Sequence, residues 1–264
     1  MEFDQFLKEI APRFGLQWKP FKKDGIKRRL DRRIIEIGYL SFEQYLEEVT
    51  HHPGEQERLS EILTVTISRF FRDREVFKIL ETTLIPTLLK NKDKKRLKIG
   101  SIGCGSGEEP YSLSLLWEEA FEKDHPEIRL SIIATDINGS LLERARGGRY
   151  KESSLKEVPE GVRRKFFKPE NGVYVLDREI RESVDFRRLN ILRDEPFPST
   201  DILFCRNCAF TYLSKEFRKE VLKRIASSLS GEGYLVIGKD ELLPLTYPTL
   251  FVPIFPKEKI YQKF

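Results

Sequence analysis

RLKIGSIGCGSGEEPYS, residues 96–112, is the stretch that decides the fold of this 264-residue chain. The apolar residues in its first half predict a short buried strand, and the run 103–107 predicts a tight turn before a helix that begins near Pro110. Glycines such as Gly103 and Gly105 let a ligand approach the backbone, because no Cβ stands in the way. In an open α/β sheet this edge is where small molecules bind, so the stretch indicates a ligand loop.

The residues next to these glycines favour a cationic ligand over a nucleotide phosphate. Glu108 and Glu109 would repel a pyrophosphate, and no P-loop Lys followed by Ser or Thr is present. S-adenosylmethionine carries a sulfonium and an ammonium, which carboxylates attract. The next predicted strand, 130–135, is followed by Asp136, and an acidic residue there suits a ribose diol. The alternative is a structural glycine turn whose acidic residues only favour the helix dipole.

Length and composition describe a soluble globular chain with room for one sizeable domain and a smaller one. No run approaches the roughly 18 apolar residues that a membrane span needs. The opening MEFDQFLKEI also lacks the basic and apolar regions of a signal peptide. We therefore expect a cytoplasmic protein without membrane insertion, and the net charge of +5 permits an acidic partner without demanding nucleic acid.

Three cysteines are too few for a disulfide framework, and their odd number does not allow all of them to pair. Cys205 and Cys208 form a C-x-x-C, but no second pair or suitably spaced histidine completes a zinc site, so we expect no metal. We expect the three histidines to be surface residues without a catalytic role.

Residues 1–75 predict an N-terminal helical domain, because their apolar residues recur at helical spacing. Within it, Ser41 and Gln44 predict a capping box at the start of a helix. Residues 76–95 then predict a linker helix leading to the first strand.

From residue 96 to 264 strands and helices alternate, which predicts an α/β fold with a doubly wound, mostly parallel, Rossmann-like sheet. At about residues 151–183 this rhythm breaks, and we expect a small inserted subdomain there. The final segments predict a closing antiparallel pair. Expected strands are 97–102, 130–135, 184–189, 201–205 and 234–238.

Two segments of the N-terminal part leave alternatives open. The second predicted helix carries seven lysines and arginines in residues 22–33, which form either a solvated face or a docking surface for an acidic partner. Nucleic acid is less favoured, because no aromatic residues are interleaved. The phenylalanines of SRFFR, residues 68–72, either belong to the core or cover a cofactor while an arginine points into the site.

Several motifs together resemble the chemotaxis-receptor glutamate methyltransferases (CheR-type). They follow the family's order over nearly the whole chain: GIKRRLDRR, SRFFRD, GEEPYS, ATDIN and FCRN. The resemblance implies an N-terminal helical domain, a methyltransferase domain and a β-subdomain inserted near residues 168–183. It implies methyl transfer from S-adenosylmethionine to glutamate carboxylates of a protein, with S-adenosylhomocysteine as product. The alternatives are another carboxylate or small-molecule acceptor, or an inactive cofactor-binding signalling module.

The resemblance also implies positions for the cofactor. Glu109 would lie near its methionine amino group, Asp136 at the ribose, and Asn190 and Ile191 at the adenine. The full implied set is Ser68, Arg72, Gly103, Gly105, Glu109, Asp136, Asn190, Ile191, Cys205 and Arg206.

Catalysis by such an enzyme needs no general base, because a glutamate is already ionised at pH 7. A guanidinium matches a carboxylate in two bonds, so Arg72 and Arg206 are predicted to orient the substrate carboxylate. The resemblance adds Tyr212 as a third predicted catalytic residue. The family's usual C-R-N-x-x-I-Y-F is altered here, with Thr211 at the tyrosine position and Tyr212 displaced by one.

The partner that the resemblance implies is an acidic helical segment of a chemoreceptor-like protein. We expect the basic helix 22–33 to hold it, and we expect the enzyme to be a monomer. The inserted FKPENGVYV is shorter than in family members that grip a receptor's C-terminal peptide, so no tight peptide binding is expected there.

Overall fold

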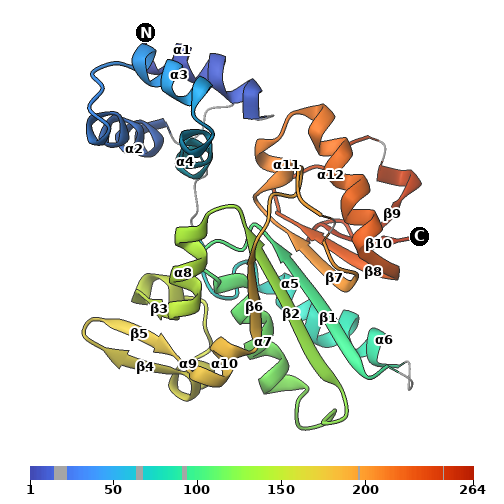
Figure 1. Ribbon diagram of the computed structural model, residues 1–264. Coiled ribbons are helices and arrows are strands. Elements are labelled where there is room, and N and C mark those ends of the chain that lie inside the picture. The colour runs from blue at the N-terminus through green and yellow to red at the C-terminus, as the bar shows by residue number, and fades with distance from the viewer. Residues whose placement is uncertain (15–22, 64–67, 91–93, 196, 246) are drawn as a thin grey trace. The chain divides into compact units, whose positions relative to one another are not determined.

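The chain forms two compact units, each with its own buried apolar cluster (Figure 1). Unit 1 is Met1–Ile67 with Tyr212–Phe217, and unit 2 is Ser68–Thr211 with Arg218–Phe264. No helix among the described residues is long and apolar enough to cross a membrane. The computed structural model describes residues 1–14, 23–63, 68–90, 94–195, 197–245 and 247–264.

Unit 1 is helical where it is described, as the sequence predicts. Phe6, Leu30 and Tyr45 are fully buried in its core. The Ser41 half of the predicted capping box is present, because the Gln44 backbone N–H donates to Ser41 Oγ. The Gln44 side chain accepts instead from the Leu40 backbone N–H, one residue before the N-cap. Its helices are α1 (Phe3–Ile10), α2 (Lys23–Glu36), α3 (Phe42–His51) and α4 (Pro53–Leu63), with a short 3-10 helix at Ala11–Phe14.

Unit 2 is built on a seven-stranded sheet of order β6-β2-β1-β7-β8-β10-β9. The five strands from β6 to β8 pair in parallel, and β10 pairs antiparallel with β8 and β9. This confirms the predicted mostly parallel sheet and its closing antiparallel pair. The strands are β1 (Arg96–Ile102), β2 (Arg129–Asp136), β6 (Val184–Arg188), β7 (Thr200–Cys205), β8 (Leu229–Ile237), β9 (Phe251–Phe255) and β10 (Ile260–Lys263).

The order of the strands creates a switch point between β1 and β7. The chain runs outward from β1 through β2 to β6 and then returns to place β7 on the other side of β1. All six residues of β7 are buried, as expected for a strand covered on both faces. In such sheets the loops that follow the strands on either side of the switch point form the binding edge.

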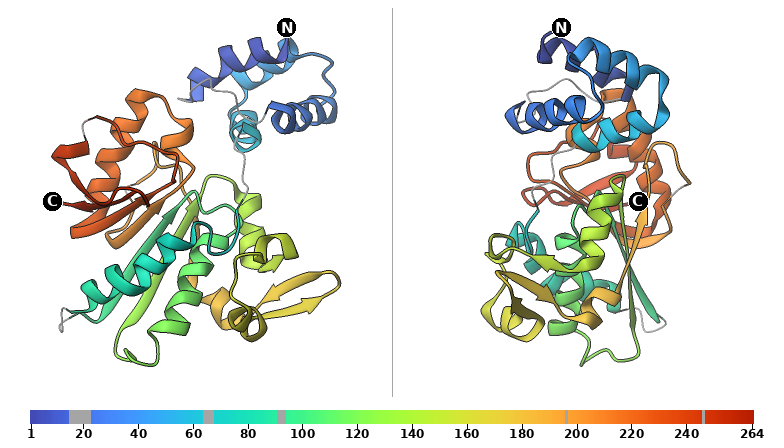
Figure 2. Two further views of the ribbon diagram at one scale, coloured as in Figure 1. Left: turned by 180° about the vertical axis from the view of Figure 1, so that it is seen from behind. Right: turned by 60° about the vertical axis from the view of Figure 1, so that its left-hand side comes forward.

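The helices of unit 2 surround this sheet. The stretch from α5 to α6 and the helix α7 lie on the same face (Figure 2). The helix α7 begins at Glu108, earlier than predicted, because Pro110 fits a first helical turn, where its missing N–H is not needed. The bounds are α5 (Arg74–Ile79), a π-helix (Leu80–Leu84), α6 (Ile85–Leu89), α7 (Glu108–Ala120), α8 (Gly139–Gly147), α9 (Glu160–Phe166), α10 (Arg178–Glu182), α11 (Ala209–Tyr212) and α12 (Lys215–Ser228).

A second, three-stranded sheet of order β3-β5-β4 interrupts the alternation, where the sequence predicts an inserted subdomain. All its pairings are antiparallel. Asn171 and Gly172 have φ values of 49° and 78°, which suits a two-residue hairpin turn. The absence of tight receptor-peptide binding to this hairpin stays a prediction. The strands are β3 (Arg149–Tyr150), β4 (Phe167–Glu170) and β5 (Val173–Leu176).

Candidate functional site

The loop after β1 has the backbone conformation that only glycine adopts readily. Gly103, Gly105 and Gly107 have φ values of 72°, 58° and 89°. A Cβ on Gly103 would lie 2.7 Å from the Cβ of Cys208, and one on Gly107 would lie 2.9 Å from the Cβ of Ala145. The loop therefore has no space for side chains at these two positions, and its glycines are structurally required.

Asp136 stands at the end of β2, next to this loop. Its Oδ2 accepts from the Gly105 amide over 2.8 Å, and its Oδ1 accepts from the Asn138 amide over 2.9 Å. The residue is 9% exposed. Because each carboxylate oxygen can accept more than one hydrogen bond, the side chain is fixed in place and still able to accept from a ligand.

Glu109 lies in the first turn of α7, on the other side of the glycine loop. Its Oε1 accepts from Ser101 Oγ over 2.9 Å, and its Oε2 accepts from Arg206 Nη1 over 3.1 Å. Burial raises the pKa of Glu109, and the positive charge of Arg206 opposes that rise. Glu109 is thus a carboxyl group that is 14% exposed and held by an arginine.

Arg206 follows β7 and joins three segments of unit 2. Its side chain is 4% exposed. Besides Glu109, it donates from Nη2 to the Arg72 carbonyl over 3.2 Å and to the Asp73 carboxylate. Its Nε is buried and has no hydrogen-bond partner among the described residues. The guanidinium therefore connects the loop after β7, the start of α7 and the segment that precedes α5.

The SRFFRD segment uses its two phenylalanines as core residues. Phe70 is fully buried and meets the rings of Tyr150 and Phe167 edge-on, at centroid distances of 4.8 and 5.1 Å. Phe71 has a left-handed φ of 52°, and its amide donates to Ser112 Oγ in α7 over 2.8 Å. The first of the two alternatives, core residues beside a charged surface, therefore describes these rings.

The polar residues of the same segment lie against the start of α7. Ser68 hydrogen-bonds the carboxyl group of Glu108, and Ser154 Oγ also donates to that group, over 3.5 Å. The charge of Arg72, which is half-buried, acts on Glu109. Two residues predicted at the cofactor, Ser68 and Arg72, are thus near the two glutamates that follow the glycine loop.

The other predicted residues occupy the ends of strands. The Leu189 amide donates to the Asp136 carbonyl over 3.2 Å, which brings Asn190 and Ile191 next to the end of β2. Cys205 is buried at the end of β7, with its sulfur 3.4 Å from that of Cys208.

Tyr212 belongs to the segment that groups with unit 1, and its catalytic role stays a prediction.

Sequence reasoning missed two acidic residues in unit 2. Asp73 binds Arg206, and Glu241, which is 3% exposed, accepts from the loop after β7. An acidic residue just after the predicted strand 234–238 was the available signal for Glu241.

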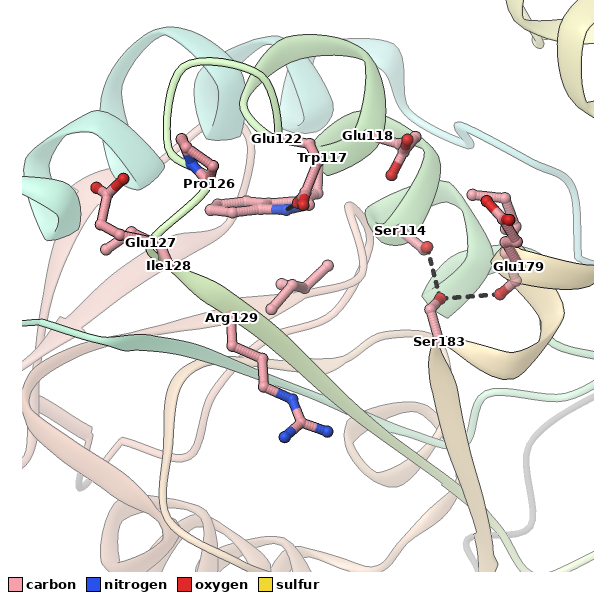
Figure 3. Close-up of a pocket in the computed structure, with 12 residues that line it drawn as sticks. Ser114, Trp117, Glu118, Glu122, Pro126, Glu127, Ile128, Arg129, Glu179 and Ser183 are labelled. Carbon is pink, nitrogen blue, oxygen red and sulfur yellow. Dashed lines mark hydrogen bonds between the residues drawn. The ribbon is translucent and has the colours of Figure 1, made fainter.

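A pocket of about 360 Å³ lies at the opposite edge of the sheet, near the start of β2 and the end of α7 (Figure 3). The Ser114 and Ser183 hydroxyls lie 2.6 Å apart in its wall. No group of three His, Cys, Asp or Glu side chains suited to a metal ion occurs among the residues that the structure describes. The lining residues are Ser114, Trp117, Glu118, Glu122, Pro126, Glu127, Ile128, Arg129, Leu130, Glu179, Ile180 and Ser183.

The residues around the glycine loop fit S-adenosylmethionine. The carboxylates of Glu109 and Asp136 flank a loop of close-packed glycines, and they can attract an ammonium group and accept from ribose hydroxyls. The unpartnered Nε of Arg206 leaves one buried donor at the same edge.

A parallel sheet with this loop and these acidic residues defines the class of S-adenosylmethionine-dependent methyltransferases. The chain belongs to the CheR methyltransferase family: the family's SAM binding domain matches residues 66–259, and its all-alpha domain matches residues 1–64.

Relatives with curated names agree with this membership. The chain is 30% identical to the chemotaxis protein methyltransferase of Listeria innocua, over 89% of this chain and 88% of the relative. It is 31% identical to chemotaxis protein methyltransferase 1 of Pseudomonas aeruginosa, over 92% and 90% of the two chains. It is also 31% identical to an uncharacterized 104.1 kDa protein of Rhodobacter capsulatus, over 84% of this chain but 23% of that protein.

Proposed function

We propose that this protein transfers the methyl group of S-adenosylmethionine to glutamate side chains of a chemoreceptor-like protein in chemotaxis. Relatives named chemotaxis protein methyltransferase, about 90% covered by this chain, support the acceptor class. The observation that carries the proposal is the cluster formed by Glu109, Arg206 and Asp73, close to Asp136 at one edge of the sheet.

The cofactor would be held by this chain's own carboxylates. We propose that Glu109 binds the amino group, that Asp136 accepts from the ribose hydroxyls, and that Asn190 and Ile191 line the adenine. When bound, S-adenosylmethionine supplies an electrophilic methyl group on a positively charged sulfur. Burial raises the pKa of Glu109 and the positive charge of Arg206 opposes that rise, which favours the ionised carboxylate that an ammonium group requires.

The acceptor needs alignment more than activation. Its glutamate oxygen donates an electron pair to the methyl carbon as the bond from that carbon to sulfur breaks, which yields a neutral ester and a neutral thioether. No proton moves, so no general base is required. Alignment of the two reactants is worth about 7–11 kcal/mol in well-oriented cases.

We propose that Arg72 binds the acceptor carboxylate. Arg206 has both terminal nitrogens engaged by protein groups, so we assign it to holding Glu109 and the segment around Asp73. Tyr212 remains a predicted participant.

We propose the exposed basic face of α2 as the docking surface for the acidic helix of the acceptor. Lys27, Arg28 and Arg32 are exposed on this helix. Arg33, which the sequence places in the same basic run, instead binds Glu55 through Nε and Nη2 over 2.9 and 2.6 Å. Lys22 lies outside the described residues.

The test is transfer of labelled methyl from S-adenosylmethionine to a purified chemoreceptor signalling domain. We expect label that is released as methanol by mild base, as an ester requires, and that is lost when the receptor's methylatable glutamates are replaced by alanine. Arg72→Ala should lower the rate at saturating receptor. Base-stable label, or label only in small carboxylic acids, would contradict the proposed acceptor.

A further inference from the structure

Glu241, which follows β8 in the chain, is a carboxylate that accepts three hydrogen bonds. Its Oε2 accepts from the Asn207 and Gly238 amides over 2.8 and 2.7 Å. Its Oε1 accepts from Thr211 Oγ1 over 2.6 Å. The residue is 3% exposed, so these three hydrogen bonds compensate for burying its charge.

The backbone around Glu241 is shaped to admit this carboxylate. Asn207 has a left-handed φ of 54°. A Cβ on Gly238 would lie 2.7 Å from Asn207 Nδ2 and 2.8 Å from Glu241 Oε2. The turn after β7 and the end of β8 are therefore in close contact, and glycine at position 238 makes that contact possible.

The turn that Glu241 binds, residues 206–211, also carries two contacts to the glycine loop and α7. Arg206 donates to Glu109 over 3.1 Å. Cys208 Sγ donates to the Ile102 carbonyl over 3.3 Å and lies against Gly103. Glu241 holds one side of this turn while the other side meets the cofactor loop.

We infer that Glu241 is a positioning residue for the cofactor site, which acts by fixing the 206–211 turn so that Arg206 and Cys208 meet Glu109 and the glycine loop. It does not touch the cofactor in this role. Loss of its carboxylate leaves two backbone amides and the Thr211 hydroxyl without their acceptor, and the turn relaxes away from the loop. The inference concerns cofactor binding alone, so its test needs no acceptor and stands apart from the proposed glutamate substrate.

The experiment measures S-adenosylhomocysteine affinity by calorimetry on the full chain, at a temperature well below the thermal transition of each variant. We expect Glu241→Ala to weaken this affinity about tenfold, the change that the loss of one good hydrogen bond produces. Thr211→Val removes one of the three bonds and should give a smaller loss. Glu241→Gln should restore most of the affinity, because its amide oxygen can accept both backbone N–H groups while its NH₂ donates to Thr211.

Asp201 provides the matched control. It lies on the same strand as Cys205 but at the opposite end of β7, and it too is a buried carboxylate with three donors, Lys94 Nζ, the Lys98 amide and Ser230 Oγ. Asp201→Ala should lower the melting temperature and leave S-adenosylhomocysteine affinity unchanged.

Wild-type affinity in both Glu241→Ala and Thr211→Val would overturn the inference. Equal losses of affinity in Asp201→Ala and Glu241→Ala would also overturn it, because they would reduce the effect to general destabilisation. If Glu241→Ala does not fold, the comparison of Thr211→Val with Asp201→Ala decides the question alone.

Discussion

Arg206 Nη1 donates to Glu109 Oε2 over 3.1 Å, joining two residues that are 97 positions apart in the chain. The arginine follows β7, the glutamate opens α7, and both stand at the carboxyl edge of the sheet. Because the same guanidinium also binds Asp73, the proposed cofactor site depends on a contact among three distant segments.

Asp136→Ala should weaken S-adenosylmethionine binding by about 1.5–3 kcal/mol, because the variant loses charged hydrogen bonds to the ribose. The Gly105 amide also loses its acceptor in this variant, so a fall in melting temperature is expected as well. Titration calorimetry measures the first effect and thermal denaturation the second. Unchanged cofactor affinity would mean that the ribose lies elsewhere.

Cofactor affinity should increase as the pH is raised, over a pH range above that in which an ordinary glutamate ionises. Burial raises the pKa of Glu109, with Arg206 opposing the shift, so part of the carboxyl population is protonated at a pH where a free glutamate is ionised. Only the ionised form attracts an ammonium group, and binding therefore releases protons at mildly acidic pH.

Glu109→Gln should bind weakly and lose this pH dependence. Glu108→Gln is the control: burial raises the pKa of Glu108 too, but its carboxyl group lies against Ser154 and Ser68. We expect this control to keep the pH dependence of the wild type. The measurement is S-adenosylhomocysteine affinity from pH 5 to 8, and a flat wild-type profile would contradict the assignment of Glu109.

Reversal of the exposed basic residues of α2, Lys27, Arg28 and Arg32, to glutamate should raise the KM for a protein acceptor and remove most of its salt dependence. Charges at the rim of an interface act mainly on association and are screened over about 8 Å at physiological ionic strength. Cofactor affinity should stay unchanged. If neither KM nor its salt slope responds, α2 has only a solvated basic face.

Arg33→Ala should act on stability instead of docking. Burial works against ionisation of Glu55, but hydrogen bonds from Arg33 and Tyr45 lower its pKa overall. A carboxyl group whose pKa is lower in the folded than in the unfolded state stabilises the fold at pH values above its unfolded pKa, and this stabilisation is lost as the pH falls. The variant should therefore lose about 1–3 kcal/mol of unfolding free energy near neutral pH and less in acid. Denaturant unfolding at pH 7 and pH 4 measures this difference, and equal losses at both would refute it.

Local chemistry made much of this structure predictable. The glycine loop and the Ser41 cap each depend on residues within a few positions of one another, and Asp136 was marked by its place directly after a predicted strand. The partners of Arg33 and Arg206 were not predictable in this way. Arg33 meets Glu55 in another helix, and Arg206 meets Asp73 at a separation of 133 positions. Charge runs show which residues are basic, but only the fold decides which of them are paired.

The return of the chain to β7 also fixes when the cofactor site can form during synthesis. A nascent chain that has completed β1, β2 and β6 already carries the glycine loop, Glu109 and Asp136, but the ribosome has not yet added Arg206. In that intermediate, Glu109 and Asp73 both lack Arg206, the guanidinium that joins them in the complete domain. We therefore expect S-adenosylmethionine to bind the finished domain, because the complete site includes the turn after β7.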